Sequence, residues 1–267
     1  MTVAPLGPSD AGAVRALLQT DPLLVLGLLD ELDQSGLDCR GSDTRWYGSW
    51  VGGRLRALSR RRVDTAWIFG APAACTALGG IHHTHDGLRE IMGSAAAVDA
   101  AWPAFSEAPP RRRLEWVQLV CNQPVHGPWL PVRQATMADL SFAGLAMTRL
   151  PRETHGESPN PMAMMWDAQA LIAQQRLLIG DVDGVPACFF SHGRLRPEGM
   201  DITGFYILPQ YRQRGLARKW GRGFLRYAYT HTQTTVLTCM ANNQIALSVY
   251  QTDDHFRLRA RIVMLQR

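Results

Sequence analysis

Helical and strand-like hydrophobic patterns alternate along the first part of the chain. Apolar residues recur at helical spacing over 11–18 and 23–32. Strand-like residues over 46–58 then flank Gly52-Gly53, a pair that is typical of a β-hairpin turn. Further strand and helix patterns follow, and the last is the strand-like stretch 114–121. The first part therefore reads as an α/β domain.

The second part has a different order of patterns. Thr136 with Asp139 three residues later resembles a helix cap, and Pro161 sits well at a first helical position. Asp183-Gly184 between two apolar runs predicts another hairpin. The predicted elements are strand 132–135, two helices, strands 176–182, 185–191 and 201–208, helix 215–229, strand 235–240, helix 243–251 and a strand-rich tail. The predicted order is β, α, α, β, β, β, α, β, α, β.

Three prolines and a glycine within 121–131 separate these two parts, as an interdomain connection would. We place the boundary near residue 127, which gives domains 1–126 and 127–267. The length of 267 residues suits two domains.

The composition, 46% hydrophobic and 19% charged, is that of a globular protein. The longest apolar run, Leu23 to Leu29, is too short for a membrane helix, and no charged leader precedes it, so we expect a cytoplasmic protein without a membrane partner. The cysteines are odd in number and never form a C-x-x-C pair, so we expect reduced thiols rather than disulfides or zinc ligands. They are Cys39, Cys75, Cys121, Cys188 and Cys239.

The net charge is +5, and Lys219 is the only lysine. Arginine binds phosphate and carboxylate through two hydrogen bonds, which suits a phosphorylated cofactor, an acidic protein or RNA. Codon usage in a GC-rich genome explains the arginine excess equally well. The charge therefore indicates a partner only where a motif requires one.

The stretch 204–218 runs from a strand through a proline turn into a helix. Arg212, Gly215 and Ala217 fit the spacing (Gln/Arg)-x-x-Gly-x-(Gly/Ala). Small residues let a ligand approach the backbone, and the N–H groups of a new helix can hold a pyrophosphate. Arg212 or Arg214 could add charge-assisted bonds. Alone, the spacing fits a tight turn into an amphipathic helix equally well.

A second block, Asn243-x-x-Ala246-x-x-x-Tyr250, follows the next predicted strand. Together the two blocks resemble the GCN5-related N-acetyltransferase (GNAT) superfamily. The chain is also similar to two-domain actinobacterial GNAT proteins, with Trp46-Tyr-Gly48 and Gly52-Gly-Arg-Leu55 in the first domain. The resemblance implies a GNAT fold, with a mixed, mostly antiparallel central sheet flanked by helices, preceded by a degenerate GNAT-like α/β domain.

The resemblance also implies roles for individual residues. The pantetheine arm would pair with backbone near Phe205, Tyr206 and Ile207, and Tyr250 would be the general acid unless it is a core tyrosine. Asn243 would hydrogen-bond the pantetheine, although a helix N-cap explains it equally well. The turn residues implied in pyrophosphate binding are Arg212, Gln213, Arg214, Gly215, Leu216, Ala217 and Arg218.

Two features depart from the family pattern. The usual Gly-Phe after the tyrosine is replaced by Asp253-Asp254-His255-Phe256, so the loop beside the thiol is remodelled. The predicted strand 201–208, which would be the fourth strand of the GNAT fold, also contains no glutamate to act as general base. Asp201, His192, Asp254 and His255 are candidates, and each also reads as an ordinary loop or surface residue.

Other signals carry less weight. The tract 81–86 is rich in histidine, but no second cluster supplies ligands at zinc spacing, so we expect a polar loop and no metal. The basic triplets 60–62 and 111–113 read as solvated faces, and the Met162 to Trp166 cluster as core. Walker A, G-x-S-x-G and H-E-x-x-H motifs are absent, which argues against the commoner NTPases, esterases and metalloproteases.

The sequence thus predicts an acyltransferase that moves an acyl group from a pantetheine thioester to an amine of a small molecule. The donor would be acetyl-CoA or another acyl-CoA, or the phosphopantetheine arm of an acidic acyl carrier protein. An aminoacyl-tRNA-dependent transferase is a second reading, disfavoured because basic stretches with interleaved aromatic residues are absent. A non-catalytic acyl-CoA-binding regulator is a third, disfavoured by Tyr250.

Overall fold

The computed structural model describes residues 1–38, 43–84, 87–156, 158–251 and 255–267. Cys39, His85, Asp86, Asp253 and Asp254 lie outside the described residues. The chain forms two compact units. Unit 1 consists of Met1–Gln118, Met240–Asn242 and Arg259–Arg267, and unit 2 of Leu119–Cys239 and Asn243–Leu258.

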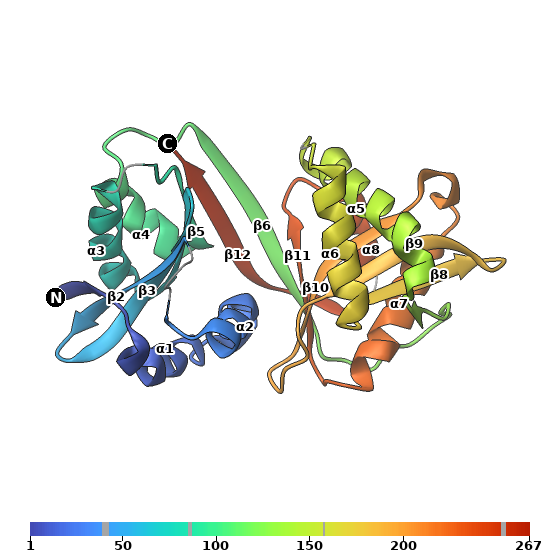
Figure 1. The fold of residues 1–267 in the computed structure, drawn as a ribbon, viewed down its shortest axis with the longest axis horizontal. Helices are drawn as coiled ribbons and strands as arrows, with labels where there is room; N and C mark the ends of the chain where they lie inside the picture. The colour runs from blue at the N-terminus through green and yellow to red at the C-terminus, as the bar shows by residue number, and fades with distance from the viewer. Residues whose placement is uncertain (39–42, 85–86, 157, 252–254) are drawn as a thin grey trace. The chain divides into compact units, whose positions relative to one another are not determined.

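Unit 1 is an α/β unit built on a mixed sheet with the strand order β1-β2-β3-β4-β5-β12 (Figure 1). Its pairs are antiparallel except β4 with β5, which is parallel. The elements are β1 (Thr2–Pro5), α1 (Ala11–Leu18), α2 (Leu26–Ser35), β2 (Thr44–Val51), β3 (Arg54–Arg62), β4 (Thr65–Gly70), α3 (Pro72–His83), β5 (Glu90–Ser94), α4 (Ala95–Phe105) and most of β6 (Arg112–Cys121) and β12 (Phe256–Gln266). The predicted helix 11–18 and the hairpin around Gly52-Gly53 are confirmed.

The second predicted helix starts later than the pattern indicates. Pro22 begins a short 3-10 turn, Pro22–Leu24, and the Asp21 side chain accepts a hydrogen bond from the Leu24 amide. The α-helix α2 then begins at Leu26. The apolar spacing does not distinguish a 3-10 turn from the first turn of an α-helix, which explains the difference.

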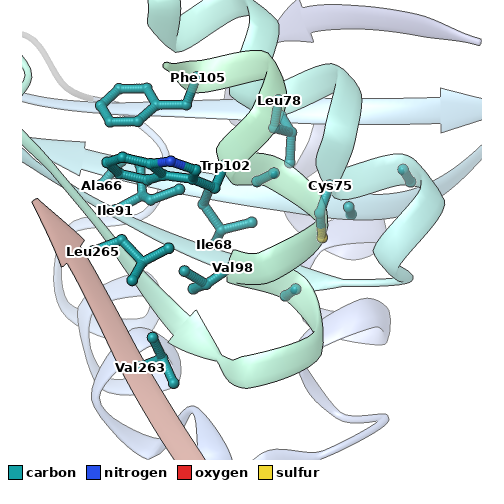
Figure 2. Packing of buried hydrophobic residues seen from close by; sticks show 14 of the residues in the cluster. Ala66, Ile68, Cys75, Leu78, Ile91, Val98, Trp102, Phe105, Val263 and Leu265 are labelled. Carbon is teal, nitrogen blue, oxygen red and sulfur yellow. The ribbon is translucent and has the colours of Figure 1, made fainter. Parts of the chain in front are cut away.

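Helices cover both faces of the sheet in unit 1. Leu78 of α3 and Trp102 and Phe105 of α4 pack on one face, together with Val263 and Leu265 of β12 (Figure 2). Residues of α1 and α2 fill the other face. Ile262 belongs to this second cluster, so three side chains of the 259–267 segment are part of the core of unit 1.

Unit 2 has the strand order β11-β10-β9-β8-β7. Only the β10–β11 pair is parallel among the pairs described in this unit. Its elements are β7 (Arg133–Gln134), α5 (Leu140–His155), α6 (Pro161–Ala173), β8 (Leu177–Val182), β9 (Val185–His192), β10 (Met200–Ile207), α7 (Leu216–Tyr229), β11 (Thr235–Met240) and α8 (Gln244–Gln251). The predicted order of elements is confirmed.

The two faces of the unit 2 sheet carry different helices. Phe189 and Tyr206 pack with residues of α5 and α6 on one face. On the other face, Phe224 of α7 stacks on Phe190 with ring centroids 5.0 Å apart. Thr136 and Asp139 form the predicted capping box before α5. The predicted mixed, mostly antiparallel sheet flanked by helices is thus present.

The boundary between the units differs from a single cut near residue 127. Unit 2 begins at Leu119, and unit 1 also takes up Arg259–Arg267. Strand β12 pairs with β5 from Ile262 to Gln266, which places this segment in the unit 1 sheet. Within the described part of the chain, no helix has the length and apolar character needed to cross a membrane.

Candidate functional site

Strand β10 contains a bulge and has an open edge beyond it. Ile202 pairs with His192 of β9, and the next pair is Gly204 with Ser191, so Thr203 is the extra residue. The parallel ladder to β11 ends at the pair of Ile202 and Leu237. A bulge re-aims a strand and ends pairing. The peptide groups of β10 after Thr203 therefore face β11 without a ladder, an arrangement that can accept another extended chain.

The side chains of the open segment point to the helices. The Phe205 ring stacks on Phe190, with centroids 4.0 Å apart and planes 12° from parallel. Tyr206 is 4% exposed and its hydroxyl donates to Glu153 Oε1 over 2.5 Å. Burial raises the pKa of Tyr206, and the bond to Glu153 raises it further. Ile207 is half-buried. What this segment offers a ligand at its open edge is thus mainly backbone.

The turn after β10 presents unbonded amides. Pro209–Tyr211 form a 3-10 turn, and Gln213 and Gly215 then adopt positive φ of 61° and 68° before α7 begins at Leu216. Among the residues that the structure describes, no acceptor meets the N–H groups of Gln213, Arg214 or Gly215. A Cβ built on Gly215 would have open space around it. Outward amides at a helix N-terminus bind anions, so the predicted pyrophosphate turn has suitable geometry.

The Arg212 side chain contacts β10 and α5. Its Nε donates to the Ile207 carbonyl over 2.8 Å, and its Nη2 forms an ion pair with Glu153 of α5 at 2.7 Å. The guanidinium also lies 4.9 Å from the centroid of the Tyr206 ring. Arg214 and Arg218 are exposed, and Arg214 lies 5.7 Å from the Tyr211 ring centroid. The cations available to a bound anion are therefore those on and after Arg214.

Helix α8 carries the second predicted block. The Asn243 side chain accepts a hydrogen bond from the Ala246 amide at 3.1 Å, so it caps this helix. Tyr250 lies near the end of α8, half-buried, with its ring in edge contact with Phe256 at 5.3 Å. In the described ranges, no hydrogen-bond partner meets the Tyr250 hydroxyl.

Electrostatics favour the protonated form of Tyr250. Burial raises the pKa of this phenol, and the nearby Cys239 thiol raises it further. The hydroxyl therefore holds its proton at neutral pH, as a general acid must before it donates. The same shift makes the phenol a weaker acid, so it favours the protonated state rather than the transfer itself.

The candidate bases have varied surroundings. His192 is 2% exposed, its Nδ1 lies 2.7 Å from the Gly193 carbonyl, and burial lowers its pKa. The Nε2 of His255 lies 3.3 Å from the amide nitrogen of His126 and 3.4 Å from its carbonyl oxygen. Asp201 is half-buried in β10 before the bulge. Each histidine thus has one ring nitrogen beside backbone groups, and the buried Nε2 of His192 meets no hydrogen-bond partner among the described residues.

The histidine-rich tract does not gather at one point. His82 Nε2 lies 2.7 Å from the Ser59 hydroxyl, whereas His83 Nδ1 lies 3.0 Å from the Phe105 carbonyl. Among the described residues, no group of three His, Cys, Asp or Glu side chains could hold a metal ion. The four described cysteines are buried.

Glu153 is a site residue that the motif analysis missed. It lies in the last turn of α5, far from both motif blocks in sequence. Burial tends to raise its pKa, but the hydrogen bonds from Tyr206 and Arg212 outweigh that effect and lower it. No spacing rule links this glutamate to the turn, because the contact depends on how α5 packs against β10.

Comparisons with known proteins bear on the fold of both units. Residues 145–256 match the family described as acetyltransferase (GNAT) family. No curated protein matches the chain. A GNAT-family acetyltransferase structure from Colwellia psychrerythraea is 14% identical, with a TM-score of 0.67, and the match covers 100% of this chain and 99% of that one.

Two further structures match over the whole chain. A GCN5-related N-acetyltransferase from Sphaerobacter thermophilus is 15% identical, with a TM-score of 0.64, over 100% of this chain and 95% of that one. A tandem GNAT protein from the clavulanic acid biosynthesis pathway is 12% identical, with a TM-score of 0.63, over 100% and 98%. Such low identities establish the fold alone, and they establish it for unit 1 as well as unit 2.

Proposed function

Because residues 145–256 match the acetyltransferase (GNAT) family, we propose that unit 2 is an enzyme that transfers an acyl group from acyl-CoA to an amine. Acetyl-CoA is the proposed donor, and a small molecule carries the acceptor amine. The observation that carries the proposal is the open edge of β10, which leads directly into the unbonded amides of the turn at Gly215.

The residues present suit a CoA thioester. The pantetheine arm, which contains two amides, would pair with the backbone of Phe205 to Ile207 as an added strand. The amides from Gln213 to Arg218 would hold the pyrophosphate at the positive end of the α7 dipole. Arg214 and Arg218 lie on the same turn and would pair with the remaining phosphate charge.

The reaction follows from these positions. A neutral amine attacks the thioester carbonyl, and the developing oxyanion is stabilised by N–H groups of the β10 edge. The new C–N bond forms and the C–S bond breaks, so the sulfur leaves as a thiolate. Tyr250 donates its proton to that thiolate and regains one from solvent. The nitrogen loses one proton, and the products are an amide and a free thiol.

The basic face of α7 supports an acyl carrier protein as an alternative donor. Helix α7 and the turn before it contain no Asp or Glu, and they carry Arg214, Arg218, Lys219, Arg222 and Arg226. Arg222 Nη1 donates to the Pro128 carbonyl over 3.1 Å, and Arg226 lies 4.9 Å from the Trp129 ring centroid. A carrier protein with an acidic surface would extend along this face, beyond the reach of a nucleotide.

The arginines at 111–113 would offer a carrier protein only part of their charge. Arg113 forms ion pairs with Asp99 and Glu115, each at 2.7 Å. Those contacts neutralise its charge locally. Arg111 and Arg112 are exposed, so they are the members of the triplet to test.

A donor comparison tests the proposal. The purified chain is mixed with acetyl-CoA and a panel of amines, and free thiol is measured. We expect thiol release that depends on the amine, together with calorimetric binding of CoA. If no acyl-CoA binds or reacts but a loaded carrier protein does, the carrier is the donor. If neither donor reacts with any amine and CoA does not bind, the acyltransferase assignment is wrong.

A further inference from the structure

Three elements of unit 2 meet at one carboxylate. Glu153 comes from α5, Tyr206 from β10 and Arg212 from the turn before α7, and we call these three residues the Glu153 clamp. One carboxylate oxygen accepts the Tyr206 hydroxyl at 2.5 Å, and the other pairs with Arg212 at 2.7 Å. Arg212 also donates a hydrogen bond to the carbonyl of Ile207, so it links the turn back to the end of β10.

The clamp lies next to a strained part of the backbone. Gln213 follows Arg212 directly and has a φ of 61°, which is unfavourable for a residue with a Cβ. Such a conformation persists only where its surroundings fix it. Helix α7 fixes the turn on its C-terminal side. On the N-terminal side, the fixed point that the structure offers is Arg212, held by Glu153 and Ile207.

The charge of Arg212 is also already matched. Its guanidinium faces the Glu153 carboxylate and the Tyr206 ring. Binding a phosphate directly would require Arg212 to leave both contacts. The geometry therefore separates Arg212 from Arg214 and Arg218, neither of which forms an ion pair with any residue that the structure describes.

We propose that Glu153 is a positioning residue for the donor. Through Arg212 it holds Gln213, Arg214 and Gly215 in the conformation that turns their N–H groups outward, and Arg212 acts through this contact rather than as a ligand of the pyrophosphate. The inference rests on the proposed function in so far as the anion is that of CoA. The contacts of the Glu153 clamp are present without a bound donor, so the effect of Glu153 on the turn can be tested independently of CoA.

A double-mutant cycle distinguishes positioning from direct binding. Glu153 and Arg212 are both exposed, so Glu153→Ala and Arg212→Ala should each weaken calorimetric CoA binding by about 3- to 5-fold, the scale of an exposed ion pair. The double variant should lose no more than either single variant. Glu153→Gln, which still accepts hydrogen bonds, should recover part of the loss. Asp167→Ala removes an exposed carboxylate of α6 and serves as the matched control, with affinity unchanged.

Additive losses in the double variant would overturn the proposal, because Arg212 would then contact the donor independently of Glu153. Unchanged or tighter CoA binding by Glu153→Ala would overturn it as well. A kcat measured with saturating acetyl-CoA should stay within about 2-fold of wild type, since a loss confined to donor positioning raises KM.

Trypsin tests the clamp without any ligand. Trypsin cleaves after arginine, so Arg212 and Arg214 are both sites inside the turn, and a looser turn is cut faster at either site under native conditions. We expect initial cleavage there to be at least roughly 5-fold faster in Glu153→Ala than in wild type or Asp167→Ala, with an unchanged melting temperature. Equal cleavage rates would overturn the clamp. Faster cleavage in a chain that binds no CoA would leave the clamp standing and refute the proposed donor.

Discussion

The two units connect a strand to a helix in different ways at corresponding points. In unit 2, residues Leu208 to Gly215 separate β10 from α7 and leave amides exposed. In unit 1, only Ala71 separates β4 from α3, and its amide donates to the Arg56 carbonyl over 2.9 Å. A one-residue connection with a bonded amide has no anion cradle. The shared fold therefore does not imply a shared site.

The parallel strand pair and the helix after it also differ between the units, and again only unit 2 has the features expected of a donor site. The β4–β5 ladder runs through Ile68 and Gly93, so closely that a Cβ on Gly93 would lie 2.1 Å from the Ile68 carbonyl oxygen. The β10–β11 ladder instead stops at a bulge. Ser94 caps α4 as Asn243 caps α8, but the residue seven positions later is the buried Ala101 in place of a tyrosine.

The largest effect on CoA binding is expected from a bulky, charged side chain in the turn before α7 of unit 2. Gly215→Glu places a bulky anion where the pyrophosphate would lie, and we expect at least roughly 100-fold weaker CoA binding. Gly215→Ala has the same positive φ but a small side chain, so it separates backbone strain from blocking. Unchanged CoA affinity in folded Gly215→Glu, measured by calorimetry, would remove the turn from the donor site.

The hydroxyl of Tyr250, which has no counterpart at Ala101 of unit 1, should account for much of the acyl-transfer rate. Tyr250→Phe should lower kcat by about 100-fold with little change in donor affinity. Because burial raises the pKa of Tyr250 above its ordinary value of 10, ionisation of this phenol should not lower the wild-type kcat below that pH. Tyr227→Phe, another half-buried tyrosine of unit 2, is the control. Wild-type turnover by Tyr250→Phe would show that Tyr250 only packs against Phe256 and does not act as the general acid.

Acid should weaken unit 2 through Asp139. The hydrogen bonds from Arg133 lower the pKa of this buried carboxyl to about 2, against the opposing effect of its burial. The carboxylate thus contributes about 2 kcal/mol above pH 4, and the contribution is lost as the pH falls toward 2.

Asp139→Asn should remove that contribution at neutral pH. Hydrogen exchange should then become faster in β8 and stay unchanged in β3 of unit 1. Asp183→Asn, in an exposed turn, is the control. An equal loss of protection in both units would show that they unfold as one.

A glutamate at the start of α3 in unit 1 should not affect CoA binding, in contrast to a glutamate at Gly215 in unit 2. Ala73 is exposed in the first turn of α3, and Ala73→Glu should leave CoA affinity within about 2-fold of wild type. Calorimetry should also give one CoA per chain. A stoichiometry of two, or a loss of affinity in this variant, would contradict the absence of a donor site in unit 1.

The sequence predicted what local patterns encode. The order of elements in unit 2, the hairpins and the turn into α7 follow from hydrophobic period, Asp-Gly and Gly-Gly pairs and small residues at fixed spacing. The bulge at Thr203, the role of Glu153 and the placement of Arg259–Arg267 depend on pairing between distant segments. The ion pair of Arg212 with Glu153 could not be predicted either, because the carboxylate comes from a helix that is distant in sequence.

The position of β12 has a consequence for biosynthesis. A ribosome delivers the chain from its N-terminus, and domains ordinarily fold in that order. All residues of unit 2 up to Leu258 emerge before Val263 and Leu265, which the core of unit 1 requires. Until then β5 has an open edge that could pair with another nascent chain. The N-terminal unit is therefore expected to finish folding last, so that a released chain that ends before residue 259 has every segment of the candidate catalytic unit but lacks part of the core of its neighbour.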